Sequence, residues 1–308
     1  MHLNHQRILK SPTADWIVFF HGMGGDCSIF SKQVPLFQQH FNLLFIDLPG
    51  HGRSIGVEGR EPVEFSVQKV IELLEFLKVP AAHFMGVSLG TLIMQRIALQ
   101  RPELIKSMVL AGAVRRFQPW GEFLVRLSLR FPLKQLMPVR WSYALFAYAL
   151  LPRRNHQRSR AIFLRAARDL RASDYHAWGA ALAFAPASIY ARLARRRNRL
   201  PKLYICGAQD HMFLPALRDF VRREEGAEWV VLPGCGHVCH IEAASRFNAL
   251  ALSFFQRVSA RPRAPAQASL GGPGSIADVT VPIPCARGYA AANRDANPGG
   301  RERGTDTP

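Results

Sequence analysis

The sequence lacks a hydrophobic run long enough to cross a membrane. Crossing a bilayer takes about 20 consecutive apolar residues. The longest candidate, Trp141 to Leu151, is shorter than this and is flanked by Arg140 and Arg153. The first ten residues contain no apolar stretch of the kind found in secretory signals. We therefore expect neither a transmembrane helix nor a signal peptide.

Cysteine is also scarce, with five residues in 308. The number is odd and the spacing irregular, which excludes the disulfide framework of a small secreted protein and favours a reducing, cytoplasmic setting. Cys235, His237, Cys239 and His240 lie close together and could suggest zinc. No second Cys/His pair stands at a suitable spacing, so we expect no metal and no cofactor.

Acidic residues are outnumbered by basic ones, 22 to 40, which gives a formal net charge of +18. Such an excess can indicate nucleic acid, an anionic membrane surface or an acidic substrate. Residues 115–200 hold 17 Arg and one Lys against three acidic residues, so they carry +15 of the total. No zinc finger, RNP-type strand or basic zipper accompanies them, and we expect no nucleic-acid partner.

Short apolar runs that stop at Gly, Pro or Asp alternate with helical patterns along much of the chain. Runs of this kind are typical of buried parallel strands, and strands that alternate with helices predict an α/β fold with a doubly wound, mostly parallel sheet. The predicted strands are a short leading strand around Arg7 to Lys10, then Trp16–Phe20, Asn42–Ile46, Ala82–Val87, Ser107–Leu110, Lys202–Cys206 and Glu228–Leu232. The clearest predicted helices are Ser66–Val79, Leu89–Gln100, Leu214–Arg223 and Ile241–Val258.

Two segments interrupt this alternation. Residues 114–200 contain no good strand and predict an all-helical lid (cap) inserted between a first core part, 1–113, and a second, 201–258. Residues 259–308 are rich in Ala, Pro and Gly, with Tyr289 as their one aromatic residue. Such a composition buries too little apolar surface to order a chain, and we expect a disordered tail.

One motif combines a nucleophile with the turn that exposes it. Gly86-Val87-Ser88-Leu89-Gly90 stands where a predicted strand ends and a helix begins. In this context G-x-S-x-G forms a strained turn that exposes the Ser88 hydroxyl and directs the Leu89 backbone N–H toward a substrate oxyanion.

A glycine-rich loop follows the first clear strand, with the sequence His21-Gly22-Met23-Gly24-Gly25. Its glycines let backbone approach a substrate, and the Met23 N–H is the natural second oxyanion donor. We expect His21 to fix the backbone of this loop rather than to act chemically. Gly22, Gly24, Gly86 and Gly90 are likewise expected to support the site.

Two further polar residues follow the last two predicted strands, Asp210 after one and His237 after the next. Both therefore fall at the carboxyl edge of the sheet, where ligands bind in open α/β folds. The chain order Ser88, Asp210, His237 matches a nucleophile, an orienting acid and a general base on this fold.

The chain resembles the α/β-hydrolase fold family, of the lid-bearing serine esterase and lactonase type. The resemblance covers residues 16–258, through HGMGG at 21–25, DLPGHGRS at 47–54, GVSLG at 86–90, GAQD at 207–210 and GHVCHIE at 236–242. It implies a serine hydrolase that cleaves a small or medium, partly apolar carboxylic ester or lactone through an acyl-enzyme. A C–C bond hydrolase or lyase that uses the same triad, and a non-catalytic ligand-binding protein on this fold, remain alternatives.

The basic insertion is a candidate for weak contact with an anionic lipid surface or an anionic substrate. Arg115, Arg116, Arg153 and Arg154 are the candidate cationic residues. Most of the apolar residues nearby are expected to pack against the core, with a minority lining the acyl pocket. They are Trp120, Phe123, Leu124, Leu127, Leu145, Phe146 and Tyr148.

Overall fold

The computed structural model describes residues 3–130, 136–166, 170–195, 199–224 and 226–260. By its internal contacts the chain divides into two units, Met1–Pro262 and Arg263–Pro308, and the description below concerns the first. The predicted disordered tail lies outside the described residues from position 261 onward.

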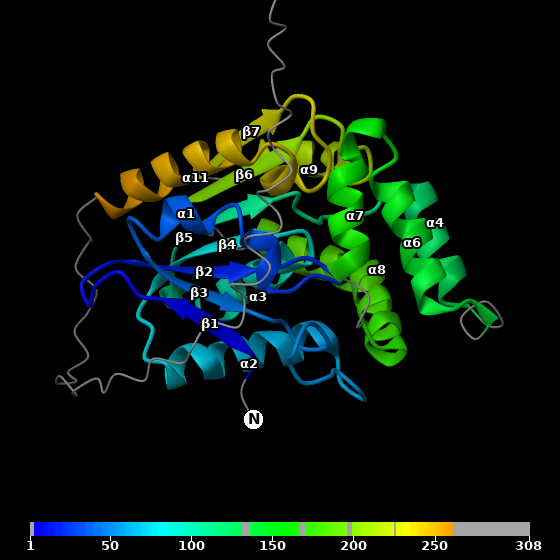
Figure 1. Cartoon of the computed structure of the whole chain (residues 1–308), viewed down its shortest axis with the longest axis horizontal. Coiled ribbons are helices and arrows are strands. Elements are labelled where there is room, and N and C mark those ends of the chain that lie inside the picture. The colour runs from blue at the N-terminus through cyan, green and yellow to red at the C-terminus, as the bar shows by residue number, and fades with distance from the viewer. Residues whose placement is uncertain (1–2, 131–135, 167–169, 196–198, 225, 261–308) are drawn as a thin grey trace, which may run out of the picture. The chain divides into compact units, whose positions relative to one another are not determined.

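A seven-stranded sheet in the order β1-β3-β2-β4-β5-β6-β7 forms the centre of the first unit (Figure 1). Strand β1 pairs with β3 in antiparallel fashion, and every other pairing is parallel. The predicted doubly wound, mostly parallel sheet is therefore confirmed. The strands are β1 His5–Ile8, β2 Trp16–Phe20, β3 Asn42–Ile46, β4 Ala82–Val87, β5 Ile105–Ala111, β6 Lys202–Gly207 and β7 Ala227–Leu232.

Helices cover both faces of the sheet because successive strand residues point to opposite sides and both sides are apolar. Phe20 and Phe84 belong to the apolar cluster on one face, whereas Phe19 and Met85 belong to the cluster on the other. The helices that pack over the sheet are α1 Val34–Phe37, α2 Pro62–Phe76, α3 Leu89–Gln100, α9 Leu214–Val221, α10 Cys239–Glu242 and α11 Ala244–Ser259. Short 3-10 turns add η1 Cys27–Phe30 and η2 Pro102–Leu104.

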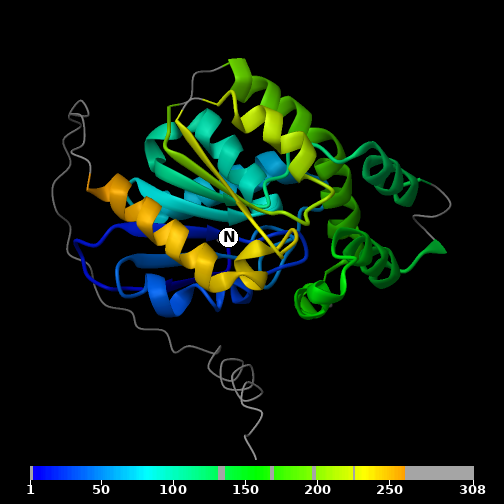
Figure 2. The same ribbon diagram turned by 90° about the horizontal axis from the view of Figure 1, so that it is seen from above.

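The chain between β5 and β6 is helical wherever it has regular structure in the described ranges. Its elements are α4 Pro119–Ser128, α6 Val139–Leu150, η3 Arg154–His156, α7 Gln157–Ala166 and α8 Ala172–Arg195. We call residues 114–200 the insertion. Figures 1 and 2 place α4 and α6 on its outer side, away from the sheet. Among the described residues, no helix has both the length and the apolar character that a membrane span requires.

Three helices differ from their predicted bounds, and α9 does so only by ending at Val221 rather than Arg223. Helix α2 begins at Pro62 rather than Ser66, because the Glu61 side chain accepts hydrogen bonds from the Val63 and Glu64 N–H groups and caps the earlier start. The helix predicted over 241–258 is two helices, α10 and α11. Ala243 interrupts them with a non-helical backbone, at φ −125° and ψ 46°.

Candidate active site

Ser88 occupies a strained turn between β4 and α3. Its backbone has φ 52° and ψ −117°, a left-handed conformation that is rare for a residue with a side chain. The Ser88 N–H donates to the Ala111 carbonyl at 3.0 Å, and the Ser88 carbonyl accepts from the Thr91 N–H at 2.9 Å and the Thr91 hydroxyl at 2.6 Å. These bonds hold the turn in a conformation that Ser88 would not adopt alone.

Gly90 allows the beginning of α3 to lie directly against the end of β2. A Cβ at this position would collide with the Phe20 carbonyl, so any larger residue would displace the helix from the sheet. Gly22 approaches the same turn, since a Cβ added to it would lie 3.3 Å from the Ser88 Cβ. The glycine-rich loop and the Ser88 turn are therefore neighbours.

Asp210 and His237 form a buried pair at the carboxyl ends of β6 and β7. The His237 Nδ1 and Asp210 Oδ2 atoms are 2.8 Å apart, and each side chain is about 1% exposed. The other Asp210 oxygen accepts from the Phe213 N–H at 3.1 Å. Because the carboxylate accepts the Nδ1 proton, the tautomer leaves Nε2 as an acceptor. Nε2 is buried and makes no hydrogen bond in the described part of the chain.

Gly112, at the end of β5, connects this pair to the Ser88 turn. It has φ +52°, and a Cβ there would lie 3.0 Å from the His237 Nδ1. The residue before it, Ala111, accepts the hydrogen bond from the Ser88 N–H. The end of β5 therefore contacts both the candidate nucleophile and the candidate base. The structure therefore brings Ser88 and His237 to the same strand end.

Met23 and Leu89, the expected oxyanion donors, both lie next to Ser88: Met23 lines the same cavity, and Leu89 is the following residue. Leu89 is the first residue of α3, where a backbone N–H has no partner within its own helix. The Tyr143 hydroxyl, from helix α6, donates to the Met23 carbonyl at 2.9 Å and lies over Gly24. The insertion thus fixes the loop that carries Met23, a role that the sequence analysis did not assign to Tyr143.

His21 is buried and bonded to backbone through both ring nitrogens. Its Nδ1 donates to the Gly22 carbonyl at 2.7 Å, and its Nε2 accepts from the Leu48 N–H at 2.9 Å. Burial lowers the pKa of His21, although Asp47 opposes the shift. The ring therefore holds the glycine-rich loop as a neutral imidazole.

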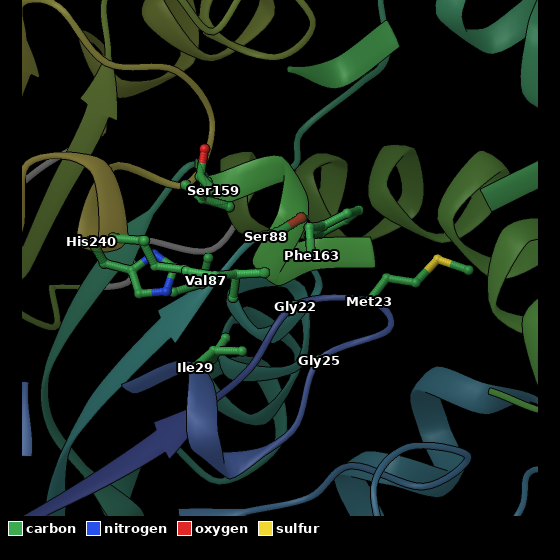
Figure 3. A pocket seen from close by; sticks show the side chains of 12 residues that line it. Gly22, Met23, Gly25, Ile29, Val87, Ser88, Ser159, Phe163 and His240 are labelled. Atoms are coloured by element: carbon green, nitrogen blue, oxygen red, sulfur yellow. The ribbon is translucent and has the colours of Figure 1, made fainter. Parts of the chain in front are cut away.

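A small cavity lies beside Ser88, roofed by helix α7 of the insertion (Figure 3). Its volume is about 20 Å³, enough for roughly one water molecule. Most of its lining is apolar. The residues around it are Gly22, Met23, Gly25, Ile29, Val87, Ser88, Ser159, Ile162, Phe163, Val238, His240 and Ile241.

His240 is the one imidazole that lines this cavity in the described chain. It is fully buried, and neither ring nitrogen has a hydrogen-bond partner among the described residues. Its pKa is lowered to about 3, first by burial and then by the neighbouring His237 and Lys32. A neutral, unpaired imidazole at this place can hydrogen-bond to a polar group of a bound substrate. The sequence analysis assigned His240 no role beyond the rejected zinc cluster.

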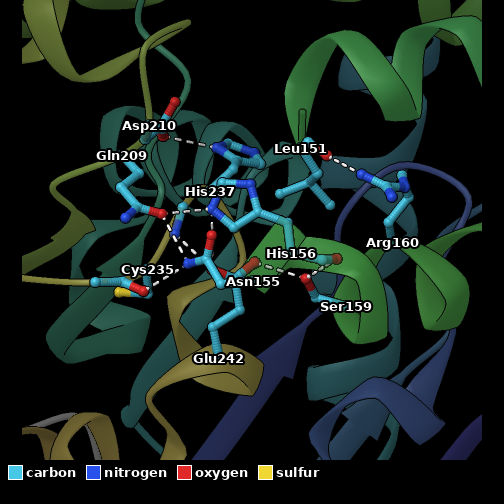
Figure 4. Close-up of polar contacts among 12 residues, drawn as sticks. Leu151, Asn155, His156, Ser159, Arg160, Gln209, Asp210, Cys235, His237 and Glu242 are labelled. Atoms are coloured by element: carbon cyan, nitrogen blue, oxygen red, sulfur yellow. Dashed lines mark hydrogen bonds and ion pairs between the residues drawn. The ribbon is translucent and has the colours of Figure 1, made fainter. Parts of the chain in front are cut away.

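Glu242 belongs to a buried polar network that joins the insertion to the histidine loop (Figure 4). It accepts hydrogen bonds from the Ser159 hydroxyl, at 2.7 Å, and from the Gly236 N–H. Gly236 immediately precedes His237. Glu242 ends α10, and its carboxylate bridges α7 to the loop of the candidate base.

The loop of Asp210 has a matching contact with the insertion. The Gln209 side-chain oxygen pairs with His156 Nε2 at 2.8 Å and accepts from the Asn155 amide at 2.9 Å. Asn155 also donates to the Gly234 carbonyl at 2.9 Å. Residues 155–159 therefore contact the loops of both Asp210 and His237, which the sequence could not show because the partners are about 50 to 80 positions apart.

The cysteines near His237 do not form a metal site with it. Cys206, Cys235 and Cys239 are buried free thiols, and burial raises the pKa of the Cys235 thiol to about 11. No group of three or more His, Cys, Asp or Glu side chains within the described ranges is arranged to hold a metal ion.

Comparisons with known proteins identify the family of this chain. The model of the alpha/beta hydrolase family matches residues 17–250. The chain is 26% identical to 3-oxoadipate enol-lactonase 2 of Acinetobacter baylyi over 238 residues, which cover 75% of this chain and 85% of that protein. It is 36% identical to a pimeloyl-[acyl-carrier protein] methyl ester esterase of Klebsiella pneumoniae over 93 residues, which cover 30% and 34% of the two chains.

Among solved structures, the fold is similar to that of the enol-lactonase from Burkholderia xenovorans. The TM-score is 0.69 and the identity 23%, over 82% of this chain and 96% of the other. The family match covers most of the chain and includes the segments that carry Ser88, Asp210 and His237. This chain is an enzyme of the α/β-hydrolase family.

Proposed function

We propose that this enzyme hydrolyses a carboxylic ester or lactone through an acyl-enzyme on Ser88. The observation that carries the proposal is the His237–Asp210 pair, whose imidazole keeps Nε2 unpaired next to a strand end that also holds the Ser88 turn. Ester and lactone cleavage by named relatives supports the same reaction class.

The reaction begins when the Ser88 hydroxyl attacks the substrate carbonyl and its proton passes to His237 Nε2. Asp210 holds Nδ1–H and stabilises the imidazolium that forms. The Met23 and Leu89 N–H groups bind the oxyanion. Collapse of the tetrahedral intermediate breaks the C–O bond, and His237 returns the proton to the leaving alcohol.

A water molecule then completes the cycle. His237 takes a proton from this water, which attacks the acyl carbon, and the second intermediate releases the acid and restores the Ser88 hydroxyl. With a lactone, the leaving alcohol stays attached to the acyl group, so the product is one hydroxy acid. No cofactor takes part in either half of this reaction.

The substrate is a small or medium, partly apolar molecule. The cavity walls include Ile162, Phe163 and Val238, which suit an apolar acyl group, and His240 offers one hydrogen bond. A volume of about 20 Å³ is too small for any ester. Helix α7, which forms the roof, must therefore move for substrate to enter, and we propose that the insertion acts as the lid.

The test is hydrolysis of a panel of p-nitrophenyl esters of graded chain length, together with simple lactones and a dienol ketone. We expect ester or lactone turnover with a burst of one alcohol per enzyme where deacylation is slow. Ser88→Ala should lose activity by about 10⁴-fold or more. Ser253→Ala, which changes an exposed serine of α11, is the matched control and should keep full activity.

Each other result identifies a different function. Turnover of the dienol ketone alone would show C–C bond hydrolysis instead. Ligand binding without turnover of any substrate would show a binding protein. Full activity in Ser88→Ala would overturn the acyl-enzyme mechanism.

A further inference from the structure

Helix α4 presents an apolar row to solvent. Trp120, Phe123, Leu124 and Leu127 follow the i, i+3, i+4, i+7 spacing of one helix face. Such a row normally faces the core, but all four side chains are exposed, and Phe123 is 64% exposed. The expectation that these residues pack against the core is wrong.

Helix α6 repeats the arrangement. Trp141, Leu145 and Tyr148 follow an i, i+4, i+7 spacing and are all more than half exposed, whereas Tyr143 and Ala147 of the same helix are buried. Both helices lie on the outer side of the insertion (Figures 1 and 2). We call these two exposed sets the outer apolar rows.

The outer apolar rows stand out from the rest of the described surface. Of the large hydrophobic side chains that are exposed there, nine belong to the insertion and two, Leu9 and Phe76, to the core. Exposed apolar patches of this kind mark interaction sites in soluble proteins. Within the described residues, the exposed large apolar side chains are therefore concentrated in one segment, the insertion.

Basic side chains lie on the same two helices or next to them. Arg116, Arg126, Arg130 and Arg140, which lie on or next to α4 and α6, are all exposed. Arg115, one of the candidate anion contacts, instead donates to the Ala216 carbonyl at 2.7 Å and stacks over Phe220. The segment that carries the outer apolar rows also holds +15 of the net charge of +18.

We propose that the outer apolar rows dock the enzyme on an anionic lipid surface. Helices that combine Trp, Phe and Leu on one side with arginine around them bind at the boundary between headgroups and acyl chains, and anionic headgroups attract the arginines. A second copy of the chain fits less well, because it would bring two basic insertions face to face. Charge complementarity therefore favours an anionic lipid surface over a second copy of the chain.

Docking there would place the candidate active site close to the membrane. Trp120 stacks on His211 with ring centroids 5.6 Å apart and an interplanar angle of 4°, and His211 directly follows Asp210. A partly apolar ester dissolved in the lipid would then meet the enzyme on the side of the insertion. The docking surface itself does not depend on the reaction that the site performs.

The test is flotation of the full-length chain with phosphatidylcholine vesicles that contain either no anionic lipid or about one third phosphatidylglycerol. We expect at least tenfold tighter binding to the anionic vesicles, weakening as salt rises. Replacing Arg116, Arg130 and Arg140 by Gln should weaken anionic binding by roughly a hundredfold, at about fivefold per arginine. Phe123→Ser with Trp141→Ser should weaken it at least tenfold.

Controls separate docking from folding. Phe76→Ser changes an exposed aromatic residue of α2 outside the insertion and should bind vesicles like the unchanged protein. All variants should keep their melting temperature and their activity, if any, on soluble esters without vesicles. Equal binding to neutral and anionic vesicles, or unchanged binding of the Phe123/Trp141 variant, would overturn the proposal. So would a dimer in solution that this variant dissociates, because the occupant would then be a second copy.

Discussion

Replacing Ser88 by glycine should stabilise the fold while it abolishes catalysis. Ser88 has φ 52° and ψ −117°, which crowd its Cβ against the backbone and which glycine adopts without this penalty. The enzyme therefore holds its candidate nucleophile in a conformation that lowers its own stability. Alanine at the same position keeps the Cβ, so it removes the hydroxyl and leaves the strain.

The magnitude follows from two opposing contributions. A strained left-handed residue costs about 1–3 kcal/mol, whereas glycine loses about 0.5–1 kcal/mol through the greater freedom of the unfolded chain. Ser88→Gly should thus gain about 1 kcal/mol relative to Ser88→Ala, or roughly 2–4 °C in melting temperature for a domain of this size. Ser253→Gly, in the exposed part of α11, should instead lose about 0.5 kcal/mol.

Urea and thermal unfolding of the four proteins, followed by circular dichroism, would measure these differences. Both Ser88 variants should be inactive, so they differ from each other in stability alone. Equal stability of Ser88→Gly and Ser88→Ala, or a less stable glycine variant, would refute the strain that we ascribe to the turn.

Three further predictions concern the surroundings of the site. Glu242→Leu keeps most of the side-chain volume but removes both acceptor oxygens, so it should lower kcat about tenfold and the unfolding free energy by about 1–3 kcal/mol by leaving the buried Gly236 N–H without its acceptor. Unchanged kinetics would show that the network does not position His237. Tyr143→Phe removes the hydrogen bond to the Met23 carbonyl. The loss of this bond, worth about 1 kcal/mol, should reduce kcat/KM about fivefold. An unchanged kcat/KM would show that the bond does not position the loop that carries the Met23 N–H. The pKa of His240 is lowered to about 3 by burial. As the pH falls, the His240 imidazole is therefore protonated in the unfolded chain before it is protonated in the folded chain. The free energy of unfolding should thus fall as the pH drops from about 6.5 toward 3. His240→Phe should flatten that fall by about 1.4 kcal/mol per pH unit, as urea titrations at pH 6.5, 5.5 and 4.5 would show; an unchanged slope would mean that His240 is not held neutral.

The sheet could be predicted because its strands are buried on both faces and are therefore apolar throughout. Trp16–Phe20 and Ala82–Val87 have the predicted bounds, and the turn at Ser88 lies where the motif placed it. The positions of Asp210 and His237 followed from the rule that residues after parallel strands share one edge of the sheet. These features depend on local pattern and on sequence order, which are visible in one chain.

The contacts of the insertion could not be predicted in the same way. Tyr143 reaches the Met23 carbonyl across 120 positions, and Ser159 reaches Glu242 across 83. Nothing in the local sequence of either partner identifies the other. The exposure of the outer apolar rows could not be predicted for a related reason, because periodicity shows that a helix has an apolar face but not whether that face meets the core or solvent.

The most direct test of the central claim is covalent labelling of the full-length chain with a fluorophosphonate probe, read by intact and peptide mass spectrometry. We predict one adduct per chain, on Ser88, that is absent in Ser88→Ala and forms at least a hundredfold more slowly in His237→Gln. No adduct on the folded chain, or an adduct on another residue that persists in Ser88→Ala, would contradict the assignment of Ser88 as the nucleophile.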